Sequence, residues 1–67
     1  MRISYNKLWK MLIDKNMKKS DLKEKAGISS ASLAKLGKGD NITADVLLRI
    51  CEVMGCRIED ILETVRD

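Results

Sequence analysis

Apolar side chains recur at helical spacing along almost the whole of this 67-residue chain, and no proline interrupts them. Positions i, i+3, i+4, i+7 and i+8 of the first stripe are Tyr5, Leu8, Trp9, Leu12 and Ile13. Residues with this spacing share one face of an α-helix, so the stripe predicts a helix over about 5–15. No segment between predicted elements is long enough for a linker, and residues 1–67 are therefore expected to form a single domain.

Two short helices are predicted next, joined by a tight turn. Leu22 and Ala26 would be the buried residues of a helix over about 19–26. Ser29 is a favourable N-cap residue for a following helix over about 30–37. Two short helices with a tight turn between them form the helix-turn-helix arrangement.

The last third of the chain predicts two more helices, which gives an all-α fold of five helices. Thr43 can cap the fourth helix, over about 44–54. The apolar stripe of the fifth, terminal helix consists of Ile58, Ile61, Leu62 and Val65. An alternative is that residues 2–4 and 63–65 pair as short strands that join the termini, although runs of three residues give only weak support to it.

Charge is divided unevenly along the sequence. Residues 1–39 contain ten Lys and Arg against three Asp and Glu, for a net +7, whereas residues 40–67 contain three against seven, for a net −4. Such asymmetry indicates a basic face for a polyanion and an acidic end that faces solvent or a partner. The alternative is that these charges only coat the surfaces of helices.

Several functional classes lack the residues that they require. The sequence has no histidine, so the usual acid–base and nucleophilic arrangements are absent and an enzyme is not expected. Cys51 and Cys56 are expected to be reduced thiols in or near the core, because a zinc site would also need carboxylates or a second chain. No metal or cofactor is expected. The chain also lacks a membrane span and a signal peptide, which predicts a cytoplasmic protein.

The run MKKSDLKEKAGISSASLAKLGKG, residues 17–39, resembles the core of Cro/C1-type (XRE-like) helix-turn-helix domains of small bacterial and phage regulators. The residues that match the family pattern are Leu22, Ala26, Gly27, Ile28, Ser29, Leu33, Leu36 and Gly39. The segments ADVLLRICEVMGC and IEDIL resemble the fourth and terminal helices of the family. The resemblance covers about residues 5–64 and implies a lambda-repressor-like bundle of five helices that forms a stand-alone DNA-binding domain.

The resemblance implies that the third helix is the recognition helix and enters the major groove. The residues implied to contact DNA are Lys19, Ser29, Ser30, Ala31, Ser32, Lys35, Lys38 and Asn41. Ser30 and Ala31 would face bases, and Lys35 would reach a base or the backbone. Independently of the family, a lysine can donate to guanine O6 or N7, a serine hydroxyl can donate or accept, and an alanine methyl can contact a thymine methyl.

Phosphate contacts are implied for Lys19 in the preceding helix, and for Lys38 with Asn41 in the loop after the recognition helix. Helix N-termini and lysines together attract phosphates, which supports these positions on physical grounds. Two serines have a purely structural alternative: Ser29 can act only as an N-cap, and Ser32 can be a solvated helix residue.

Three features depart from the family pattern. Lys18 stands where the second helix usually has a Thr or Ser cap, so either Ser20 caps a shorter helix or backbone and solvent suffice. Leu12 and Gly37 occupy the two positions of an Arg–Glu ion pair between the first helix and the recognition helix. The base-facing positions lack Gln, Asn and Arg, so specificity is expected to be modest or to depend on DNA shape.

Together these features predict a sequence-specific transcriptional regulator that represses as a homodimer on a palindromic DNA operator. The acidic C-terminal end is the first candidate dimer surface, through Ile58, Leu62 and Val65, and the N-terminal residues 1–3 are the alternative. A helix-turn-helix protein-interaction module, antitoxin-like or an adaptor, is the second candidate function. An RNA-binding role is disfavoured, because the two aromatic residues lie on a stripe expected to be core.

Overall fold

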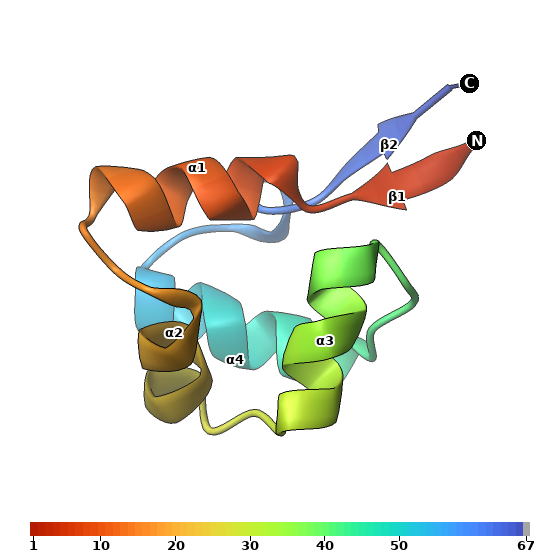
Figure 1. Ribbon diagram of the computed structural model, residues 1–67. Helices are drawn as coiled ribbons and strands as arrows, with labels where there is room; N and C mark the ends of the chain where they lie inside the picture. Colours follow the sequence, from red (N-terminus) through yellow and green to blue (C-terminus); the bar gives the residue numbers. More distant parts are fainter. Residues whose placement is uncertain (67) are drawn as a thin grey trace.

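The computed structural model describes residues 1–66, which form four α-helices, one turn of 3₁₀ helix and a two-stranded sheet (Figure 1). In chain order the elements are β1 (Arg2–Ser4), α1 (Asn6–Asp14), α2 (Lys19–Ala26), α3 (Ser30–Lys38), α4 (Ala44–Met54), η1 (Ile58–Asp60) and β2 (Glu63–Val65). The first four predicted helices are confirmed, and their ends lie within one residue of the predicted ends.

The prediction of a fifth α-helix is wrong, and the fold is mostly helical with a small sheet instead of all-α. Within residues 1–66, the segment after α4 forms only the short η1 turn before β2, which pairs antiparallel with β1. Arg2 lies opposite Val65, and Ser4 lies opposite Glu63, so the alternative of paired terminal strands is confirmed. Two physical causes favour the strand. Thr64 and Val65 are β-branched, and β1 offers backbone hydrogen-bonding groups that a terminal helix would leave unpaired.

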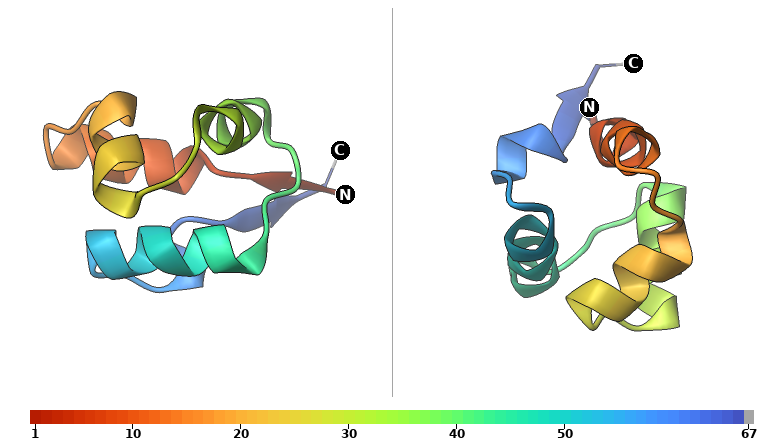
Figure 2. Two further views of the ribbon diagram at one scale, coloured as in Figure 1. Left: turned by 90° about the horizontal axis from the view of Figure 1, so that it is seen from below. Right: turned by 90° about the vertical axis from the view of Figure 1, so that its left-hand side faces the viewer.

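One core joins the elements. Its largest fully buried side chains are Leu8, Leu22, Leu36, Ile50 and Ile61. They come from α1, α2, α3, α4 and the residue after η1, so every helix contributes one. Burial of such a side chain contributes about 1.5–3 kcal/mol, and the helices are therefore fixed mainly by this shared core. Figure 2 shows α1 and α4 on different sides of the bundle, with α2 and α3 closing a third side.

Both cysteines are free thiols, as predicted: Cys51 is buried in α4, and Cys56 is half-buried after it. Burial, and then the proximity of Cys51, raises the pKa of the Cys56 thiol above its ordinary value. The described residues contain no group of three or more side chains that could hold a metal ion. None of the helices in residues 1–66 has the length and apolar character that crossing a bilayer requires.

Candidate nucleic-acid interface

The turn between α2 and α3 is held by backbone geometry and by one side chain of α4. Gly27 ends α2 at φ +65°, in the left-handed region that glycine adopts at little cost. The next N–H, of Ile28, donates to the carbonyl of Lys23 at 3.1 Å, and the Ile28 side chain is buried. Arg49 of α4 donates through its guanidinium to the Gly27 carbonyl at 3.5 Å. The buried Ile28 side chain and the Arg49 hydrogen bond therefore fix the turn relative to the core.

Ser29 is the N-cap of α3, so its predicted structural role is confirmed. Its Oγ accepts a hydrogen bond from the backbone N–H of Ser32 at 3.1 Å. The Ser29 hydroxyl also donates to Oγ of Ser32 at 3.1 Å. Both serine hydroxyls thus have a partner inside the protein, while Ser29 stays exposed and Ser32 half-buried.

One side of α3 is exposed and carries mainly small or basic residues. Ser30, Ala31 and Lys35 are all exposed, whereas Leu36 on the other side is only 1% exposed. Figures 1 and 2 show α2 and α3 as neighbours, and α2 also packs against α4. We call the exposed residues Lys19 of α2 and Ser30, Ala31 and Lys35 of α3 together the α2–α3 face.

The start of α2 carries Lys19, and the tryptophan of α1 lies beside it. Lys19 is exposed, and its Nζ lies 4.6 Å from the centroid of the Trp9 ring. A cation at this distance from an indole is attracted by the ring's electron-rich face. The cap of α2 differs from both expected arrangements, because the backbone N–H of Lys18 donates to Oδ2 of Asp21 at 2.9 Å. A carboxylate in the first turn thus stabilises the helix start, in place of Ser20 or solvent alone.

The remaining candidates are Lys38, the last residue of α3, and Asn41 in the loop that follows it, and both are exposed. This loop is anchored to α1, since the phenol of Tyr5 donates to the backbone carbonyl of Asp40 at 3.2 Å. Burial, and secondarily the charge of Asp40, raises the pKa of Tyr5 above its ordinary value, so the phenol keeps its donor proton. Lys35 and Lys38 take part in none of the ion pairs formed over the described residues, and both are exposed.

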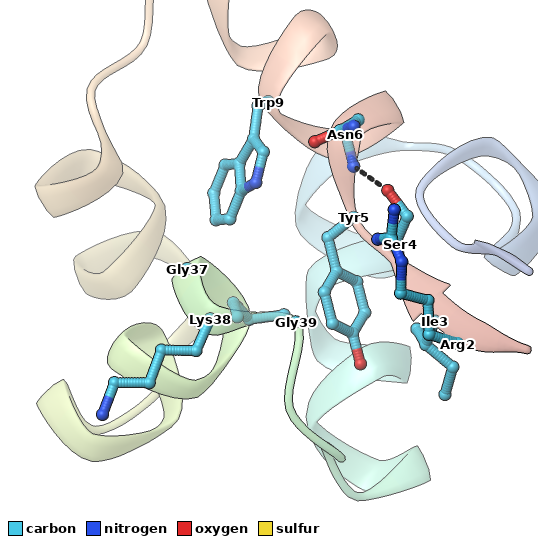
Figure 3. Close-up of a pocket in the computed structure, with 10 residues that line it drawn as sticks. Arg2, Ile3, Ser4, Tyr5, Asn6, Trp9, Gly37, Lys38 and Gly39 are labelled. Atoms are coloured by element: carbon cyan, nitrogen blue, oxygen red, sulfur yellow. Dashed lines mark hydrogen bonds between the residues drawn. The ribbon is translucent and has the colours of Figure 1, made fainter. Parts of the chain in front are cut away.

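A pocket of about 200 Å³ lies between the N-terminal segment and the end of α3 (Figure 3). It is lined by Arg2, Ile3, Ser4, Tyr5, Asn6, Trp9, Leu36, Gly37, Lys38 and Gly39. A Cβ added at Gly37 would meet no atom within 4 Å, so this position has room for a larger residue. Leu12, the other position that departs from the family's ion pair, is 3% exposed and belongs to the core.

The three candidate dimer residues do not share the face of a terminal helix. Ile58 lies in η1 and Leu62 follows it, and both pack against the core. Val65 lies in β2 opposite Arg2 of β1. The two dimer surfaces predicted as alternatives, at the N-terminus and at the C-terminal end, are therefore neighbours in one small sheet.

Two contacts at the interface are not among those expected from the sequence. Trp9 was assigned to the core, and it does pack there, but it also approaches Lys19. Its place at the edge of the apolar stripe was the only signal for this second contact. Arg49 offered no signal for its contact with the helix-turn-helix turn, because 22 residues separate it from Gly27.

Comparison with known proteins identifies the family. The family model described as the Cro/C1-type HTH DNA-binding domain matches residues 7–67. The crystal structure of the transcriptional regulator VanUg is 52% identical in sequence, and the match covers 98% of this chain and 88% of that one, with a TM-score of 0.94. No curated protein matches the chain. A helix-turn-helix whose second helix, α3, is capped by Ser29, and a family match over residues 7–67, show that the chain belongs to the Cro/C1-type helix-turn-helix DNA-binding family.

Proposed function

We propose that this protein is a sequence-specific transcriptional regulator, and that it represses by inserting α3 into the major groove of DNA. Membership of a DNA-binding family over residues 7–67 is the observation that carries the proposal. The exposed side of α3 gives it a physical basis, because small side chains let a helix approach base edges closely. VanUg, similar to this chain over almost its full length, is itself a transcriptional regulator.

Base contacts would come from exposed residues of α3. Ser30 and Ala31 are exposed in its first turn, and Lys35 follows about one turn later. Lys35 would donate to guanine or to the DNA backbone, while Ser30 would contact a base edge and Ala31 a thymine methyl. Ser29 and Ser32 are hydrogen-bonded to each other. We therefore propose that they contribute to DNA binding by stabilising the N-terminus of α3.

Phosphate contacts would flank the recognition helix on both sides. Lys19 lies at the start of α2, and Lys38 and Asn41 lie at the end of α3 and in the following loop. These residues would fix the register of α3 on the duplex without reading sequence. Because Tyr5 anchors the loop, the position of Lys38 and Asn41 is coupled to the start of α1.

A homodimer would read a palindromic operator. A domain of this size covers few base pairs, and helix-turn-helix dimers contact two half-sites about 34 Å apart. We place the dimer contact at the terminal sheet, where residues 1–3 and Val65 are neighbours, with Leu62 directly before β2 and Ile58 in η1. The two dimer surfaces predicted from the sequence, residues 1–3 and the C-terminal end, are neighbours in this sheet.

Footprinting on the DNA upstream of the protein's own gene, combined with light scattering, tests the proposal. We expect protection of a two-fold-symmetric site, and a scattering mass in the complex that corresponds to two copies. A monomer that protects no symmetric site would contradict the dimeric repressor. Tight binding to a co-purified protein, with no protection of DNA, would favour a protein-interaction module instead.

A further inference from the structure

We propose that Trp9 is a positioning residue for DNA binding, and that its indole ring holds the ammonium of Lys19 where a backbone phosphate is bound. The inference rests on the proposed function, because it takes Lys19 as a phosphate contact. It adds a residue of α1, outside the helix-turn-helix, to the parts of the chain that determine DNA affinity.

The first support is the geometry of the pair. The 4.6 Å between Lys19 Nζ and the ring centroid is well within the reach of about 6 Å over which a cation is attracted to an aromatic face. Indole gives the strongest such attraction among the aromatic side chains. Trp9 is half-buried and packed against the core, so its ring is fixed. Lys19 is exposed, so its ammonium can contact the ring and still be open to a ligand.

The second support is the position of the Lys19 ammonium at the N-terminus of α2. Lys19 is the first residue of α2, an eight-residue helix. Within the described chain, the backbone N–H groups of Lys19 and Ser20 donate to no other residue, as is usual in a first helical turn. A phosphate could therefore accept from these N–H groups and from the ammonium together. Asp21 opposes this attraction with its negative charge, although its Oδ2 accepts a hydrogen bond from the N–H of Lys18.

The third support is that the Trp9 ring limits the rotamer freedom of the Lys19 side chain. A lysine side chain has a flexible four-carbon stem and loses much rotamer freedom when its ammonium is fixed on a ligand. The Trp9 ring restricts that freedom before DNA arrives, so less is lost on binding. The ring also lines the pocket beside Gly37, and in Figure 3 it points from α1 toward the end of α3. Trp9 thus lies where α1, the start of α2 and the end of α3 meet.

A double-mutant cycle between Trp9 and Lys19 tests the inference. The variants are Trp9→Leu, Trp9→Phe, Lys19→Met and the Trp9→Leu/Lys19→Met double variant. Lys25→Met, at another exposed lysine of α2, is the matched control. The readouts are affinity for a short mixed-sequence DNA duplex at several salt concentrations, and the thermal midpoint of each variant. Phosphate contacts are independent of sequence, so this probe does not require the operator.

The expected results are specific to a positioning role. Trp9→Leu weakens DNA binding by about two- to fivefold, the value of an exposed cation–π contact, and Trp9→Phe weakens it less. Lys19→Met weakens binding and lowers the magnitude of the salt slope by about one. In the Lys19→Met background, Trp9→Leu causes no further loss. Lys25→Met changes affinity less than Lys19→Met does.

Other outcomes would overturn the inference. An equal loss from Trp9→Leu with and without Lys19 would show that the ring acts only through packing. Tighter binding by Trp9→Leu would show that the ring holds Lys19 away from DNA. If Trp9→Leu does not fold, two measurements replace it: the DNA affinity of Trp9→Phe and the fluorescence emission of Trp9, the single tryptophan. We then expect DNA to change that emission in the parent and to change it less in Lys19→Met, and an equal change in both overturns the inference. Absence of any salt-dependent binding by the parent would instead refute the proposed function, and the inference with it.

Discussion

The phenol of Tyr5 donates a hydrogen bond to the backbone carbonyl of Asp40, 35 residues further along the chain, at 3.2 Å. Tyr5 precedes α1 and is 3% exposed, whereas Asp40 lies in the exposed loop after α3. The bond therefore ties the loop that carries Asn41 to the core of the bundle. Its loss would affect both the stability of the fold and the position of a proposed phosphate contact.

Tyr5→Phe is expected to lower the free energy of unfolding by about 0.5–1.5 kcal/mol, because it removes one hydrogen bond and keeps the ring. Urea denaturation measures this change. Hydrogen exchange should show faster exchange of the amides of residues 39–43 and little change in α4. Unchanged exchange in this loop would show that Tyr5 does not anchor it.

High pH should destabilise the parent through the same residue. Burial raises the pKa of Tyr5 in the folded chain above its unfolded value of 10.0, so the folded state holds the proton more tightly than the unfolded state does. The stabilisation is therefore complete below pH 10.0 and is lost as the pH rises toward the folded pKa. Denaturation of the parent and of Tyr5→Phe across this range should show a steeper loss in the parent. Cys56, whose pKa is also raised, is common to both proteins and cancels in the difference.

The glycines of the helix-turn-helix should respond to alanine in opposite ways. Gly37 is helical and has open space around its Cβ position, so Gly37→Ala should stabilise the fold by about 0.5–1 kcal/mol. Gly27 has φ +65°, where a Cβ is strained, so Gly27→Ala should destabilise by about 1–2 kcal/mol. Thermal unfolding of the two variants checks the pair. Destabilisation by Gly37→Ala would contradict the open space around position 37.

The sequence predicted the helices well, since each has both an apolar stripe and a local end signal. Ser29 and Thr43 cap α3 and α4 as expected, because an N-cap acts within three residues of its own position. The terminal strands were only an alternative, since pairing of residues 2–4 with 63–65 depends on a contact across the entire chain. Tertiary contacts of this kind, including that of Trp9 with Lys19, leave no periodic signal.

Lys35 and Lys38 are expected to differ in what they contribute to DNA binding. Lys35→Ala should weaken binding to the operator by about 1–3 kcal/mol and relax its sequence preference, if Lys35 donates to a base. Lys38→Ala should weaken binding to all sequences alike, because a phosphate contact carries no sequence information. Affinities for the operator and for an unrelated duplex separate the two effects. If both variants lose equal affinity for the operator and for the unrelated duplex, Lys35, like Lys38, contacts the DNA backbone and not a base.

The salt dependence of DNA affinity tests most directly whether the α2–α3 face binds DNA. Each phosphate contact releases counterions, so log K should fall linearly with log salt by about 0.9 per contact. For about four to six contacts we predict a slope of about −4 to −5 for the parent, with a smaller magnitude in Lys19→Ala and no change in Lys25→Ala. A flat response of the parent, or the same slope in the parent and Lys19→Ala, would contradict the assignment of this face to DNA.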